Sequence, residues 1–573
     1  MNEMVKKYKV KVQKSGKKRS LTAERKRKLE EIELARSRKS LTESPKSAKK
    51  KAEKKAKTKS TSGETKPRGK NASDFAVLGK AQSDWNGVQK PTTRFNRFCR
   101  SFIEYGIYGV LIFSPLPAAS VYEWSVLVIV LAVFAMTAAY LVMPYKALMN
   151  GVMGKALRWP QRLFSLLFVF LIIQIVPWPK FLVRILSPGT YRFYQSFDPG
   201  FQTGGFLSLS LVPFDTLKMS LEILAYILLG WLVLRTVRTR RQINRILGVI
   251  VGMGLFQAFY GFFELYSKNP SILFYKKIYY QGYVTGTFVN RNHLAGYLEM
   301  TIPLMLGLIL ARSGFFSLSG LRWKDKLLKL SEKGIYSNLL LALGVTFMAL
   351  AIIFSQSRSG ISLVVISFLL FIELGVLYFK RGVERKRAMQ RFLGVVFMGI
   401  TVLAMFAGID ATLQRFSMDK ILASERPVFW SNSLEIVSDY PVMGSGLGTF
   451  ASIYPAYEKN GIKGHRLEHA HNDCLEYLSE LGVVGMALLL GGILMMLIPA
   501  FLIWRVRNRP FVKGVGLGGV VAVLAILIHG ITDFNLHIPA NMVLFSVVLS
   551  LTVVVCFYKA SEKVREGKRE TKS

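Results

Sequence analysis

Long apolar runs recur from about residue 102 to residue 558, and they constrain the fold of this chain more than any other feature. Each run has about 17–25 residues, enough for an α-helix to cross a bilayer core of roughly 30 Å. A helix satisfies its own backbone hydrogen bonds, so it can cross lipid without exposing unpaired polar groups. The sequence therefore predicts an all-α polytopic membrane protein rather than a set of soluble domains.

We expect about twelve transmembrane helices, of which the first is interrupted by Pro115 and Pro117. The expected spans cover residues 102–119, 122–143, 161–178, 216–236, 243–264, 290–311, 337–355, 360–379, 392–408, 480–504, 514–532 and 538–558. A long polar loop at 410–479 separates the ninth span from the tenth. Because binding and catalytic residues concentrate on loops held by a rigid scaffold, this loop is the first place to look for a site.

Basic residues gather in every second gap between the spans. They follow the fourth, sixth, eighth, tenth and last spans, at 235–245, 322–329, 380–387, 505–509 and from 559 onward. Lys and Arg are enriched in loops on the cytoplasmic side of a membrane. The pattern predicts that both termini are cytoplasmic and that loop 410–479 is extracytoplasmic, in the periplasm if the cell is Gram-negative.

The first hundred residues form a strongly basic leader. They hold 31 Lys and Arg against 10 Asp and Glu, about half of the chain's net charge of +42, with almost no aromatic residues. This composition is typical of a disordered segment. It fits a solvated cytoplasmic tail or contact with anionic lipid head groups. Specific nucleic-acid binding is not expected, because no stacking aromatics are interleaved.

Two arginines in the expected outer loops are candidates for anion binding. Arg358 lies in the Ser-Arg pair of a tight turn between spans seven and eight, where its planar fork suits a phosphate or a diphosphate. The alternative for Arg358 is a side chain that reaches lipid phosphates at the interface. Arg426 opens a helix expected to run to about Val437, and Trp430 shares its face at i+4. The alternative for this pair is an exposed basic residue with an interfacial tryptophan.

His471 is the candidate general base. It precedes Asn472 and Asp473, which can cap a helix leading into span ten. A histidine at this position can take a proton from a hydroxyl nucleophile. The alternative is a polar loop residue that helps to cap the helix. His469 and His471 have a spacing that could hold a metal, but no matching third or fourth ligand is evident, so we expect neither metal nor cofactor.

Several segments occur in an order that resembles the O-antigen ligase/O-antigen polymerase domain. They are Gly286 to Tyr297, Ser357-Arg358, Arg426 to Trp430, Pro441 to Gly448, Ala470-His471-Asn472 leading into Glu480-Leu481-Gly482, and Asp533 to Ala540. The resemblance is strongest over about 285–490. It implies a core at 286–490 between N-terminal helices (101–285) and C-terminal helices (491–558), with basic cytoplasmic tails at 1–100 and 559–573.

The resemblance implies a metal-independent glycosyltransferase of the outer leaflet of the bacterial inner membrane. Its donor would be a glycan on undecaprenyl diphosphate, and its acceptor a hydroxyl of lipid A-core, of a growing glycan or of a protein. By similarity, Arg358 and Arg426 would grip the diphosphate and His471 would deprotonate the acceptor. Asn472 would either orient the imidazole or cap the following helix.

Three further residues are expected to support this site, each with an alternative. Arg291 and His293 would line the glycan cavity, or mark the start of a helix that Asn290 caps. Asp533 could pair with one of the arginines, but we favour a solvated helix end for it.

The acceptor is left open between a ligase, a polymerase and a protein O-oligosaccharyltransferase. A hypothesis from another functional class is that the chain is a solute transporter, since about twelve spans suit one. Such transporters often show related halves, but this chain shows no such symmetry, and loop 410–479 has no counterpart in the first half. A third reading is a scaffold whose basic tail recruits cytoplasmic partners.

Overall fold

The computed structural model describes residues 93–144, 151–312, 333–378, 383–406, 414–417, 419, 425–459 and 467–558. The tails expected at 1–100 and 559–573 lie outside the described residues, apart from 93–100. The elements are α4 (Arg94–Phe113), η1 (Ala118–Ser120), α5 (Glu123–Val142), α6 (Gly151–Ala156), α7 (Arg158–Ile175), β1 (Pro177–Pro179), α8 (Lys180–Leu186), α9 (Pro188–Phe197), β2 (Phe206–Ser208), α10 (Pro213–Thr236), α11 (Arg240–Leu265), β3 (Ser271–Ile272), β4 (Tyr275–Lys276), α12 (Arg291–Ala311), α14 (Lys333–Ser355), α15 (Arg358–Tyr378), α16 (Val383–Phe406), α19 (Arg426–Asp439), α20 (Phe450–Ile453), η3 (Tyr454–Tyr457), α21 (Asp473–Val506), α22 (Pro510–His529), η4 (Asn535–His537) and α23 (Pro539–Phe557).

The prediction of an all-α polytopic membrane protein is confirmed. Each expected span coincides with a helix, and within the described ranges ten helices are long and apolar enough to cross a membrane. The other two are α4 and α16. In α16 the apolar part is shorter, at Val396–Met405.

The first expected span ends earlier than the sequence analysis placed it. Helix α4 stops at Phe113 rather than continuing to residue 119. Pro115 and Pro117 follow directly, and proline both lacks a backbone donor and disfavours helix in the residue before it. Beyond them Ala118 to Ser120 have positive φ angles, so the chain turns sharply into α5.

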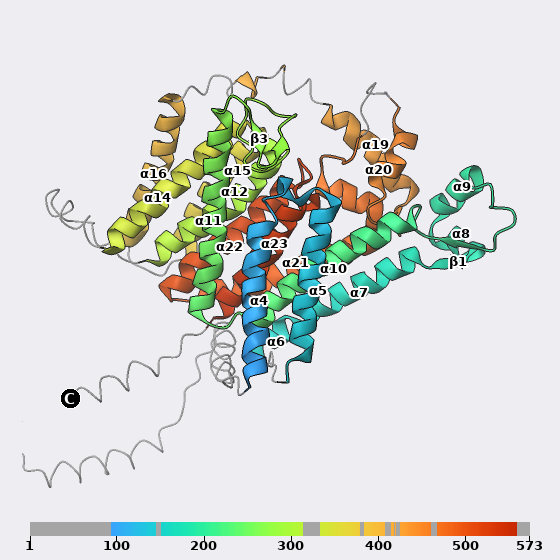
Figure 1. Ribbon diagram of the computed structural model, residues 1–573, viewed down its shortest axis with the longest axis horizontal. Coiled ribbons are helices and arrows are strands. Elements are labelled where there is room, and N and C mark those ends of the chain that lie inside the picture. The colour runs from blue at the N-terminus through green and yellow to red at the C-terminus, as the bar shows by residue number, and fades with distance from the viewer. Residues whose placement is uncertain are drawn as a thin grey trace, which may run out of the picture. The chain divides into compact units, whose positions relative to one another are not determined.

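Helices α12, α22 and α23 form the centre of the bundle (Figure 1). Small residues bring α12 and α22 close together. A Cβ added at Gly514 would lie 2.3 Å from the carbonyl oxygen of Gly307, and one at Gly518 would lie 2.3 Å from that of Pro303. In a membrane, glycines at such a crossing let two helices pack closely.

The bundle has two ends, which we call the loop face and the basic face. On the loop face, contacts join the ends of α4, α7, α10, α12, α14, α15, α19, α21 and α22. Three of these contacts are Ser210 N–H to Gln174 O (2.8 Å), Val284 N–H to Phe354 O (3.3 Å) and Asp473 N–H to Gly530 O (2.7 Å). On the basic face, the opposite ends of α15, α21 and α22 meet where the Lys513 ammonium donates to Tyr378 O (3.0 Å) and Arg505 O (3.1 Å).

Two short antiparallel ribbons lie in the loops of the loop face. Strands β1 and β2 pair Trp178 with Leu207 between α7 and α10. Strands β3 and β4 pair Ile272 with Tyr275 in the connection between α11 and α12. Neither ribbon is long enough to form a sheet domain, so the loop face is built on helix ends.

Candidate active site

A glycine turn docks the middle of the polar loop onto α21. Ser445 N–H donates to Ser479 O (2.9 Å) and Gly446 N–H to Glu480 O (3.0 Å). Gly444 and Gly482 both have positive φ, and a Cβ on Gly444 would lie 2.1 Å from Glu480 O. Only glycine tolerates both the left-handed backbone and this close approach. The turn therefore fixes α19, which carries Arg426, against the start of α21, which follows His471.

Asp533 connects the two loop residues that the sequence singled out. The Arg426 guanidinium donates to Asp533 Oδ2 (3.0 Å) and to the carbonyl oxygen of Thr532 (2.6 Å). The ring atom Nδ1 of His471 lies 3.2 Å from Asp533 Oδ1. Asn292 donates its amide to Oδ2 (2.6 Å). One carboxylate thus holds an arginine, an imidazole and an amide that lie far apart in the sequence.

Asp533 is fully buried, whereas its two charged neighbours are partly open. The side chain of Asp533 is 0% exposed, that of Arg426 is 23% exposed and that of His471 is 26% exposed. Burial raises the pKa of Asp533, but the hydrogen bond from His471 and the charge of Arg426 outweigh it and hold this pKa well below its usual range. Asp533 is therefore a carboxylate at neutral pH. The solvated helix end favoured from the sequence is wrong.

His471 is held from several sides. Its backbone has a φ of +50°, a conformation uncommon for residues other than glycine. Its ring stacks on Phe429 (centroids 6.1 Å apart) and meets Phe534 edge-on (4.8 Å). The indole N–H of Trp430 donates to the carbonyl oxygen of His471 at 3.4 Å. This strained backbone is imposed by its surroundings, as is common at functional sites.

Arg358 and Arg415 add positive charge to the same region. Arg358 is the first residue of α15, directly after a turn in which Gln356 has a φ of +53°. It lies within electrostatic reach of Arg415 and Arg426. Arg415 acts on Arg291 in the same way. The guanidinium groups of Arg291, Arg415, Arg358 and Arg426 thus each lie within electrostatic reach of the next, and Arg426 shares the carboxylate of Asp533 with His471.

Arg291 is held in an aromatic cage rather than facing an open cavity. It is 7% exposed, and its guanidinium carbon lies 4.3 Å from the ring centre of Tyr283 and 5.2 Å from that of Tyr280. Cation–π contacts of this kind stabilise a partly desolvated arginine. The loop with both tyrosines is anchored by a buried ion pair between Lys277 and Glu264 (2.6 Å).

Two further candidates, His293 and Asn472, lie at the starts of helices in the structure. Asn290 caps α12 by accepting from the N–H of Asn292 (2.9 Å), and His293 is buried behind Phe534 with ring centres 4.5 Å apart. Asn472 caps α21 by accepting from the N–H of Leu475 (3.0 Å). Its side-chain oxygen is therefore engaged with the backbone, as the capping alternative predicts, and an orienting role of its amide group stays a prediction.

A second acid–histidine group lies next to the first and is more closed. Nδ1 of His537 lies 2.7 Å from Asp473, and its Nε2 lies 3.4 Å from Glu476. His469 contacts Glu476 at 2.7 Å and stacks on Phe534 at 4.2 Å. Burial lowers the pKa of His537, but the carboxylates of Glu476 and Asp473 outweigh it and raise this pKa to about 9.

Three members of this second group could hold a metal ion by their chemistry. They are His469, Glu476 and His537, whose ligand atoms lie within 4.8 Å of one another. From the sequence, a metal site would pair His469 with His471, and no third ligand is evident. The structure separates those two histidines, since His469 faces Glu476 and His471 faces Asp533. In the structure, Glu476 contacts both His469 and His537, so the three side chains are joined to one another through this carboxylate.

The sequence predicts no site role for four residues of this region, which are Arg415, Asp473, Glu476 and His537. Arg415 is a single arginine in a loop, and no motif accompanies it. Asp473 and Glu476 are three residues apart on one helix, a spacing that places them on one face. This spacing indicates that the two carboxylates lie close together, but it does not indicate that they meet His537, about sixty residues further on.

Comparison with protein-family models matches residues 343–490 to the family described as O-antigen ligase. No curated protein matches the chain. The matched segment runs from α14 into α21 and includes Arg358, Arg426 and His471, whereas Asp533 and Arg291 lie outside it. The match confirms the resemblance seen in the sequence and assigns a general O-antigen ligase-type function to a multi-pass membrane protein. Residues 343–490 of this chain therefore form a domain similar to the O-antigen ligase family.

Proposed function

We propose that the chain transfers a glycan from undecaprenyl diphosphate to an acceptor hydroxyl on the extracytoplasmic face of the bacterial inner membrane. The observation that carries this proposal is that Asp533 joins His471 to Arg426, the last of four arginines that act on one another through their charges. Arg291, Arg358, Arg415 and Arg426 act on one another or on Tyr280 through their charges. Asp533 offsets the charge of Arg426, but the other guanidinium groups still repel one another, so this arrangement favours a ligand with several negative charges.

A diphosphate on a lipid meets that requirement. Arginine forks bind phosphate oxygens with two parallel charged hydrogen bonds. Arg426 and Arg358 are the residues proposed to bind the diphosphate, since both belong to the matched domain. Arg415 supplies further charge at the same place. As the bond between the diphosphate and the sugar breaks, these cations stabilise the negative charge that grows on the leaving oxygen.

His471 is the proposed base. Its Nδ1 faces the carboxylate of Asp533, so Nδ1 carries the proton and Nε2 keeps a lone pair. The acceptor hydroxyl then attacks the anomeric carbon, its proton passes to Nε2, and the diphosphate leaves with the bonding electron pair. Asp533 stabilises the imidazolium that forms. No step in this proposal requires a metal ion.

The acceptor stays open between lipid A-core, a growing glycan and a protein hydroxyl. All three supply a hydroxyl nucleophile, and the arginines and His471 act on the donor side and on the proton. We retain the ligase or polymerase of a surface polysaccharide as the proposal, with protein O-glycosylation as the alternative within the family.

The first test replaces the base. His471→Ala should lower glycan transfer by about 10²–10⁴-fold, the usual worth of a positioned general base, while expression stays normal. The matched control is Asn472→Ser in the adjacent residue, because serine preserves the helix cap. Lipopolysaccharide gels and lipid-linked glycan pools provide the readout. Loss of all O-chain indicates a ligase, and a single repeat unit on the core indicates a polymerase.

Transfer that survives in His471→Ala would refute the proposed role of the histidine. Normal surface glycan together with altered solute uptake would favour the transporter reading instead.

The second test concerns orientation. Cys474 is exposed at the start of α21, whereas Cys99 and Cys556 are buried. We expect a membrane-impermeant maleimide to label Cys474 in intact spheroplasts, with Cys474→Ser as the control. Labelling that appears only after the membrane is permeabilised would place His471 on the cytoplasmic side and contradict the proposal.

A further inference from the structure

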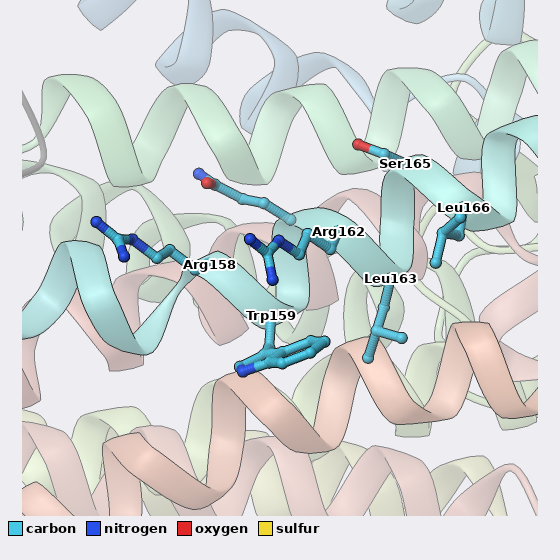
Figure 2. A pocket seen from close by; sticks show the side chains of 7 residues that line it. Arg158, Trp159, Arg162, Leu163, Ser165 and Leu166 are labelled. Carbon is cyan, nitrogen blue, oxygen red and sulfur yellow. The ribbon is translucent and has the colours of Figure 1, made fainter.

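Two arginines and a tryptophan form a charged pocket where α7 begins, at the basic face. Arg158 and Arg162 lie four residues apart and follow one another along one side of the helix in Figure 2. Trp159 between them is 59% exposed, and the guanidinium carbon of Arg162 lies 5.0 Å from its ring centre. An open depression of about 590 Å³ lies beside them on the surface of α7, and Leu163 and Leu166 also line it.

An apolar groove adjoins this pocket. It has a volume of about 630 Å³ and runs between α7, α10, α21 and α23. Its wall is mostly apolar, with Phe164, Leu228 and Ile493 among the side chains that line it. Gln161 and Ser165 line both cavities, so the charged pocket and the groove are continuous along α7.

A third arginine lies at the basic-face end of the groove. Arg235 lines it near the end of α10, and its guanidinium carbon lies 5.3 Å from the ring of Trp231. Its Nε is buried and makes no hydrogen bond to any described residue. The charged pocket and the apolar groove thus have cations at the same end of the bundle.

These three arginines make no ion pair with a carboxylate in the part of the chain that the structure describes. Arg158 and Arg162 at i and i+4 repel each other, which weakens the first turns of α7. An anion between them would remove that cost. An exposed tryptophan beside them is typical of the membrane–water interface, where lipid phosphates lie.

We propose that this pocket and groove bind one anionic phospholipid. Its phosphate lies between Arg158 and Arg162, close to Arg235, and one acyl chain occupies the groove between α7, α10 and α23. Charge complementarity selects an anionic head group, and the continuity of pocket and groove selects a lipid rather than a soluble phosphate. A polybasic contact of this kind favours anionic lipid at the membrane surface.

The site lies in the leaflet opposite the arginine–histidine site. Helix α7 has 18 residues, about 27 Å at 1.5 Å per residue, and its other end reaches the glycine turn through Gln174, whose amide donates to Met443 O at 2.6 Å. The proposed lipid is therefore not the glycan donor. Its binding does not depend on the proposed glycosyl transfer, so each can fail without the other.

The test titrates lipid onto the full-length chain in detergent and counts bound lipids by native mass spectrometry. The probe is phosphatidylglycerol, compared with phosphatidylcholine of the same acyl chains. We expect tighter binding of phosphatidylglycerol and a loss of roughly tenfold or more in Arg158→Gln/Arg162→Gln. Both arginines are exposed, so this variant should fold normally.

Two further variants separate the head-group site from general charge and from the groove. Arg97→Gln/Arg241→Gln removes two exposed arginines elsewhere at the basic face and should bind phosphatidylglycerol as the wild type does. Leu228→Trp fills the groove and leaves the arginines intact, so it should weaken binding as strongly as the double arginine variant.

Three results would overturn the proposal. They are equal binding of the two lipids, an equal loss in the Arg97/Arg241 control, and unchanged binding in Leu228→Trp. The first two would indicate general adhesion of lipid or of charge, and the third would leave the groove without an occupant.

Discussion

Two groups of the same residue types lie on either side of Phe534 and differ mainly in their access to solvent. In the open group, His471 faces Asp533 and is 26% exposed. In the closed group, His537 lies between Asp473 and Glu476 and is 3% exposed.

The difference lies in what remains free on each imidazole. In the closed group, carboxylates face both ring nitrogens of His537, and its raised pKa keeps it protonated at neutral pH. A protonated imidazole between two carboxylates holds α21 against the loop before α23, but it cannot accept a proton. In the open group one nitrogen of His471 faces Asp533, and the proposed mechanism uses the other to accept a proton. Histidine and carboxylate together therefore do not identify a catalytic base; a proposed base must also keep a ring nitrogen that can accept a proton.

The closed group should dominate stability. His537→Gln leaves Asp473 and Glu476 facing each other without the positive charge, and removing one partner of a buried pair costs about 3–5 kcal/mol. We expect a marked fall in the unfolding temperature in detergent. His469→Gln is the matched control, since it removes a histidine with one carboxylate contact that is 28% exposed. A His537→Gln protein as stable as the wild type would contradict the structural role of the closed group.

The open group should dominate catalysis. Asp533→Asn keeps the shape of the side chain but removes the charge that holds His471 and Arg426. We expect kcat to fall about a hundredfold, no more than the loss in His471→Ala, because Asp533 acts through the histidine. Turnover of a lipid-linked donor in detergent gives the measurement. Asp533→Glu should recover part of the activity, and a variant with full kcat would show that the open group does not act as a unit.

Much of the scaffold could be predicted from the sequence, because local composition determines which segments can cross a membrane as helices. Runs of apolar residues located the helices. The two prolines that follow α4 are also local, and they explain why this helix ends before residue 119. The capped start at Asn472 was also predicted, since capping depends on neighbours in the chain. These features are set by residues within a few positions of one another.

The partners inside the site could not be predicted in the same way. Asp533 looked like a solvated helix end because its contact with Arg426 joins residues 107 positions apart. The closed group was missed for the same reason, since His537 meets α21 only after the bundle has closed. The resemblance located Arg358, Arg426 and His471 as candidates, but only the fold shows that Arg426 and His471 meet the same carboxylate.

Arg415 gives the smallest expected effect and the sharpest test of the charge argument. Its guanidinium acts on Arg291 and Arg358 through space, and the described contacts include no ion pair for it. If it supplies charge to a bound diphosphate, Arg415→Gln should raise KM for the lipid-linked donor about tenfold, worth about 1.4 kcal/mol, and leave kcat close to the wild-type value. Arg415→Lys should recover most of the loss, because charge matters here more than fork geometry. The effect should shrink as salt is added, since a partly exposed charge is screened.

Asp533→Asn should instead lower kcat, so the two variants distinguish the loss of charge at the donor site from the loss of orientation of the base. A fall in kcat in Arg415→Gln with unchanged KM would place this arginine with the open group and remove it from the donor site.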